Sequence, residues 1–123
     1  MEDRIIDLEE ALGNLSGDVP LLQEILDTFL GSAAGRVRKL EESLAKDDLA
    51  TVRSQALALA EEAGNVCGHR IGRLADELAM LAPSPGQTDA DQLLDRIERE
   101  VDRLAQMVAE IDWRQLRARQ PAR

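Results

Sequence analysis

The sequence predicts an all-α protein, an up-down-up-down four-helix bundle preceded by a short N-terminal helix. Four segments carry apolar residues at the spacing of amphipathic helices, in three of them at alternating intervals of three and four, and short polar connections separate the segments. Aromatic residues make up only 2% of the chain, so the core must be aliphatic, which disfavours strands rich in aromatic and β-branched side chains. Amphipathic helices joined by short connections form such a bundle.

The N-terminal half is divided by helix-terminating residues. A short helix is expected over residues 5–12, closed by Gly13 and Asn14. Asp18 suits an N-cap, with Pro20 in the first turn of a long helix that runs to about Ala45. The apolar positions of this helix are Leu22, Ile25, Leu26, Phe29, Val37, Leu40 and Leu44.

Three more helices are expected in the C-terminal half. A turn over residues 46–48, with Asp48 as N-cap, precedes a helix that ends near residues 67–68. A further helix precedes a Pro-rich loop at 82–87, and Thr88 with Asp91 begins the last one. The apolar seams are, in order, Leu49, Val52, Ala56, Leu59, Ala63 and Val66; Ile71, Leu74, Leu78 and Leu81; and Leu94, Ile97, Val101, Leu104, Val108 and Ile111.

Composition excludes several classes of protein. The 123 residues suit a single domain, residues 1–123, with a core over about 5–111 and a tail at 112–123. A formal net charge of -9 disfavours a nucleic-acid partner. The chain shows neither a signal peptide nor a membrane span, so no membrane association is expected. The single cysteine cannot form an internal disulfide, which fits a reducing, cytoplasmic location.

The helix over residues 49–68 carries an apolar residue away from its seam. Leu57 lies roughly 130° from the middle of the seam. It shares its flank with small and charged residues: Ala50, Arg53, Ala60, Glu61, Gly64 and Gly68. Three interpretations stay open: Leu57 is the centre of a docking face, an isolated surface leucine, or a residue covered by the N-terminal segment.

Residues 56–67 of the same helix, Ala-Leu-Ala-Leu-Ala-Glu-Glu-Ala-Gly-Asn-Val-Cys, resemble a known family pattern. Histidine phosphotransfer (HPt) domains, the four-helix carriers of bacterial and plant phosphorelays, carry Ala-His-x-Leu-Lys-Gly-(Ser/Ala)-Ala-x-Asn-(Leu/Val)-Gly. The matching framework positions are Ala56, Leu59, Ala63, Asn65 and Val66. The resemblance extends over about residues 5–111 and implies the bundle fold.

The chain departs from the family at the reacting positions. Leu57 stands where the family has its phosphorylated histidine, and a leucine offers no lone pair to a phosphoryl group. Ala60 replaces the lysine that would neutralise phosphoryl oxygens, and Glu61 replaces a glycine that permits close approach. Glu62 is expected to add repulsive charge. The resemblance therefore implies a fold that has lost the phosphorelay reaction.

The resulting hypothesis is a non-enzymatic, non-phosphorylatable adaptor that docks a response-regulator receiver domain or a histidine kinase. The docking residues would be Arg53, Leu57, Ala60, Glu61, Gly64 and Gly68. One alternative is a phosphotransfer protein that uses His69, the only histidine, although the family's lysine and glycine spacing is missing around it. Another is a helical-bundle interaction protein unrelated to phosphorelays. No cofactor is expected, and one histidine and one cysteine without clustered spacing argue against a metal.

Overall fold

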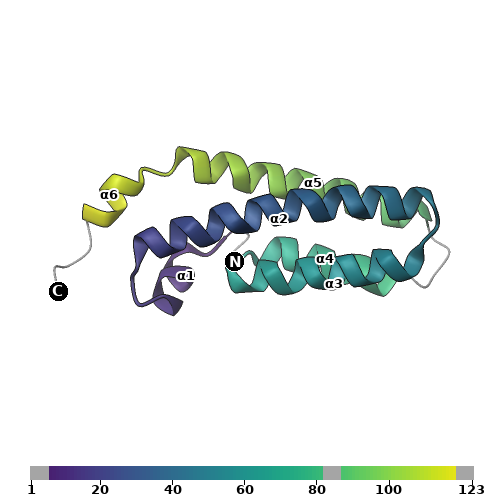
Figure 1. Cartoon of the computed structure of the whole chain (residues 1–123), viewed down its shortest axis with the longest axis horizontal. Coiled ribbons are helices and arrows are strands. Elements are labelled where there is room, and N and C mark those ends of the chain that lie inside the picture. The colour runs from purple at the N-terminus through teal and green to yellow at the C-terminus, as the bar shows by residue number, and fades with distance from the viewer. Residues whose placement is uncertain (1–5, 82–86, 119–123) are drawn as a thin grey trace.

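The structure, a computed structural model, describes residues 6–81 and 87–118, and these ranges contain helices and no strand (Figure 1). The expected all-α class is confirmed. The helices are α1 (Leu8–Asn14), α2 (Val19–Ala45), α3 (Leu49–Asn65), α4 (His69–Leu81), α5 (Gln87–Glu110) and α6 (Trp113–Ala118).

Helices α2 to α5 run alternately up and down and form the bundle (Figure 1). Each packs against two neighbours, in the ring order α2, α3, α4, α5 and back to α2. At 27 residues, α2 is about 40 Å long and extends beyond α3 and α4. Helices α1 and α6 both contact α2 in this region.

The core is aliphatic, as the composition requires. Leu22, Leu26 and Leu40 of α2 are fully buried, and so are Ile97 and Leu104 of α5. Of the expected α3 seam, Val52, Ala56, Leu59, Ala63 and Val66 are each at most 2% exposed, whereas Leu49 at the start of the helix is half-buried. Helix α3 thus packs one face against the core and exposes the opposite face to solvent.

The first three helices end in the same type of C-terminal turn. A non-glycine residue with positive φ follows the helix: Ser16 (55°), Asp47 (55°) and Cys67 (58°). The next amide then donates to a carbonyl five residues back, at 2.7 Å after α1 and 2.8 Å after α2 and α3. The following helix begins almost at once, with Asp18 and Asp48 as N-caps as expected.

The structure departs from the expected elements at the ends of the chain. Helix α1 begins at Leu8 rather than at residue 5, and α5 begins at Gln87. Helix α6 lies in the segment that was expected to be a tail, and Asp112 accepts a hydrogen bond from the Gln115 amide at its start, at 3.0 Å. Most of the expected loop at 82–87 lies outside the described residues. Among the described helices, none is long and apolar enough to cross a membrane.

Candidate docking face on helix α3

The outward face of α3 presents an apolar side chain. Leu57 is 44% exposed, whereas Leu59, two residues further along the same helix, is 0% exposed. Leu57 therefore lies outside the core, as its position relative to the seam predicted. The described N-terminal segment does not bury it.

The neighbours of Leu57 form a mixed surface. Arg53 lies one turn before it and Glu61 one turn after it, and both are exposed. Gly64 is also exposed, and a Cβ added there would meet nothing within 4 Å. Along this face, the apolar side chain of Leu57 thus lies between a cation and a carboxylate. Gly64, a position without a side chain, follows one turn after Glu61.

Helix α4 borders this face on one side. Ala60 is half-buried, and its carbonyl oxygen would lie 3.7 Å from a Cβ built on Gly72 of α4. The small residues at this contact allow the two helices to pack closely. Ala60 is thus at the edge of the exposed face, next to α4.

Gly68 does not belong to this exposed surface, which corrects the sequence-based assignment. The residue is buried in the turn between α3 and α4, where its amide donates to the Ala63 carbonyl at 2.8 Å. Helical geometry ends at Asn65, so extrapolating the α3 face to residue 68 placed it wrongly. We therefore define the docking face as Arg53, Leu57, Ala60, Glu61 and Gly64.

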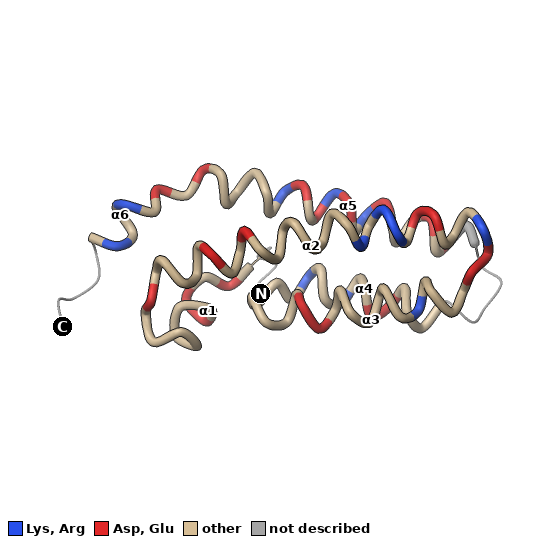
Figure 2. The backbone as a smooth tube through the Cα atoms, in the orientation of Figure 1, with Lys and Arg blue, Asp and Glu red and all other residues tan. Residues whose placement is uncertain are grey.

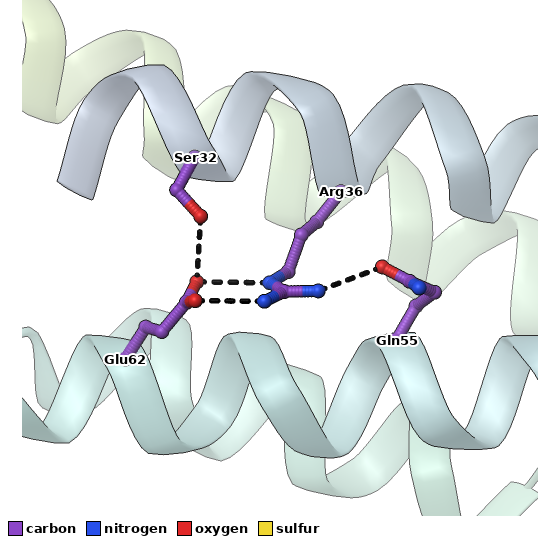
Figure 3. A network of polar contacts seen from close by, with 4 residues as sticks. All are labelled: Ser32, Arg36, Gln55 and Glu62. Carbon is purple, nitrogen blue, oxygen red and sulfur yellow. Dashed lines mark hydrogen bonds and ion pairs between the residues drawn. The ribbon is translucent and has the colours of Figure 1, made fainter. Parts of the chain in front are cut away.

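Glu62 also points away from Leu57, contrary to the sequence interpretation. Its carboxylate accepts two hydrogen bonds from the Arg36 guanidinium of α2, at 2.9 and 2.8 Å, and one from the Ser32 hydroxyl at 3.0 Å (Figure 3). Arg36 also donates to Gln55 at 2.9 Å. The hydrogen bonds from Arg36 hold the pKa of Glu62 below its ordinary value. Glu62 therefore joins α2 to α3, and its charge is neutralised there.

His69 lies at the first position of α4, separated from the docking face by the buried turn. Its Nε2 atom is 2.8 Å from Oε1 of Glu10 on α1, and both side chains are about half exposed. The Cys67 sulfur belongs to the same group, since the three ligand atoms lie within 4.8 Å of one another. Burial is the main reason why the pKa of the Cys67 thiol rises to about 11.

A basic groove of about 410 Å³ lies between α4 and α5. Arg70 donates to the buried Glu100 carboxylate at 2.8 Å, and Arg103 donates to the same oxygen at 3.0 Å. Acidic and basic residues are interspersed along α5 (Figure 2). These contacts pair part of the positive charge of the groove with a carboxylate of the protein itself.

The fold and this face together define a helical-bundle protein with a partly exposed leucine at the centre of α3. The sequence matches the family model of the Hpt domain over residues 24–107, more than half of the chain, so the chain belongs to the Hpt domain family. Its structure is similar to that of histidine-containing phosphotransfer protein B from Pseudomonas aeruginosa PAO1. The TM-score is 0.78 at 20% identity, over 98% of this chain and 100% of that chain. No curated protein sequence matches the chain.

Proposed function

We propose that this Hpt domain is an adaptor that accepts no phosphoryl group and docks a receiver domain or a histidine kinase through the α3 face. Family membership supports a phosphorelay-related role and disfavours the unrelated helical-bundle alternative. The observation that carries the proposal is Leu57. By resemblance it occupies the acceptor position, and it remains 44% exposed.

The surroundings of Leu57 support docking without phosphoryl transfer. Leucine is not a nucleophile, and Ala60 offers no cation to a phosphoryl oxygen. The exposed Glu61 carboxylate would repel one. An apolar anchor between Arg53 and Glu61 nevertheless resembles the arrangement of many protein interfaces, where an apolar centre is bordered by charges.

The environment of His69 disfavours the alternative in which it takes up phosphate. Its Nε2 atom faces the Glu10 carboxylate at 2.8 Å. A phosphoryl group entering at this nitrogen would meet a negative charge and would have to displace that contact. His69 also starts a helix, rather than lying on the middle of the α3 face.

Phosphoryl transfer provides the direct test of the chemistry. The chain is incubated with a phosphorylated receiver domain or an active histidine kinase, and acid-labile, base-stable phosphate is measured. We expect no uptake by the native chain. A matched variant that carries Leu57→His, Ala60→Lys and Glu61→Gly restores the family pattern on the same helix, and we expect it to take up phosphate. Phosphohistidine in the native chain would refute the proposal and identify His69 as the acceptor.

Binding provides the second test. Titration calorimetry with unphosphorylated receiver domains and kinase domains should give a one-to-one complex with at least one of them. If the complex forms equally well with Leu57→Glu, the α3 face is not the docking site. If no receiver or kinase domain from the native cell binds, the adaptor proposal is refuted.

A further inference from the structure

The fold brings together three side chains that are typical ligands of transition metals. Glu10 comes from α1, Cys67 from the turn after α3, and His69 from the start of α4. The carboxylate, thiol and imidazole ligand atoms all lie within 4.8 Å of one another. The sequence disfavoured a metal site because Cys67 and His69 alone provide too few ligands. The third donor comes from a residue more than fifty positions earlier.

The separations suit a tetrahedral ion after small movements. Zinc bonds of about 2.3 Å to sulfur and about 2.0 Å to nitrogen or oxygen place tetrahedral ligands roughly 3.3–3.6 Å apart. The 2.8 Å contact between His69 and Glu10 would have to open by less than about 1 Å. Both side chains are about half exposed and therefore free to adjust, whereas Cys67 is buried and fixed.

The surroundings of the sulfur favour a bound cation. The Asn14 side-chain amide donates toward Sγ of Cys67 at 3.6 Å, which is the kind of contact that supports a metal-bound thiolate. The ligand oxygen of Glu10 lies within 4.8 Å of the sulfur, so a carboxylate gives the site a negative potential. A divalent ion would offset that potential and stabilise the thiolate.

The backbone holds the donors in place independently of a ligand. The Asp7 amide donates to the Cys67 carbonyl at 3.1 Å and ties the residue before α1 to the turn. The Asp7 side chain then caps α1 by accepting from the Glu10 amide at 3.0 Å. These contacts hold the backbone of Glu10 beside the turn that carries Cys67 and His69, and the Glu10 side chain can still move to meet an ion.

We propose that Glu10, Cys67 and His69 form a zinc-binding site that joins α1 to the α3–α4 turn. Thiolate, imidazole and carboxylate are the donors that Zn²⁺ accepts, and three protein ligands leave one coordination position for water or a partner's side chain. The site is separate from the docking face around Leu57, and it does not depend on the proposed adaptor function.

Cobalt titration of the untagged, reduced protein tests the site, with Co²⁺ as a spectroscopic substitute for Zn²⁺. The chain has one cysteine and one histidine, so a thiolate-to-cobalt charge-transfer band can arise only from Cys67. We expect this band to saturate at one ion per chain and to disappear on addition of Zn²⁺ but not of Mg²⁺. Zinc should also raise the melting temperature, because an ion that prefers the folded state stabilises it.

Variants at exposed positions identify the other ligands. Glu10→Gln and His69→Gln should each weaken cobalt binding by about 10-fold or more, since even supporting residues of metal sites have effects of this size. Glu9→Gln, an exposed carboxylate on the same helix, is the matched control and should bind normally. The absence of the band in the folded native chain would overturn the proposal. Unchanged affinity in both Glu10→Gln and His69→Gln, or a melting temperature insensitive to zinc, would also overturn it.

Discussion

Two leucines of α3 provide a controlled comparison of docking and stability. Full burial of a leucine side chain contributes about 1.5–3 kcal/mol, and Leu57 is 44% exposed, so Leu57→Ala should cost about 1 kcal/mol of unfolding free energy. Leu59 is 0% exposed, and Leu59→Ala leaves a cavity in the core that should cost about 2–5 kcal/mol. If Leu57 is the interface anchor, its truncation should weaken partner binding by about 2 kcal/mol, roughly 30-fold.

The assay measures both quantities on each variant. Urea unfolding followed by circular dichroism gives the free energy of unfolding, and calorimetry gives the affinity for the receiver or kinase domain. Leu57→Glu should abolish binding and preserve helical content, because glutamate has a good helix propensity and the position is partly exposed. Leu59→Ala, kept well below its midpoint of unfolding, should bind almost normally. The reasoning is refuted if Leu57→Glu unfolds the bundle or if its affinity matches that of the native chain.

Three further predictions concern the surrounding contacts. Arg36→Met and Glu62→Gln should show a coupling energy of about 1 kcal/mol in a double-mutant cycle. Because the pKa of Glu62 is lowered from 4.5, its contribution is present above that pH and is lost as the pH falls below it. The native chain should therefore lose more stability in acid than Glu62→Gln does, and equal losses would contradict the assigned ion pair. Replacing the N-cap Asp48 by Ala should lower the melting temperature, because the Thr51 amide loses its acceptor, and no change would contradict the cap. In the metal-free protein, a thiol pKa raised from 9.0 to about 11 should slow alkylation of Cys67 at about pH 8 by about 100-fold, relative to a thiol with the ordinary value. Rapid labelling of the folded chain would contradict the burial of this residue.

Local sequence patterns were sufficient to predict the helical bundle. Seam spacing identifies a buried helix face from neighbouring residues alone, and Leu59, Ala63 and Val66 are buried as expected. The N-caps Asp18 and Asp48 were equally clear, because a capping side chain bonds to amides two or three residues away. The exposure of Leu57 follows from the same geometry.

Contacts between residues far apart in the sequence could not be predicted from local patterns. The pairing of Glu62 with Arg36 depends on the packing of α2 against α3, and the approach of Glu10 to His69 depends on where α1 folds back. Gly68 was misplaced because a helical projection continues past the residue where the helix ends. Helix α6 has only six residues and too few apolar positions to show a seam.

The tight connections between successive helices have a consequence for how the chain folds. Three of the four sides of the bundle join helices that are consecutive in sequence, and only the contact between α2 and α5 joins distant segments. Consecutive helices can dock after closing short loops, whereas the α2–α5 contact requires a long loop to close. Such a topology should reach its native state within microseconds to milliseconds, as other helical bundles do. The docking of α5 on α2 would then be the slow, rate-limiting event, and destabilising that contact should retard folding more than destabilising the turn between α3 and α4.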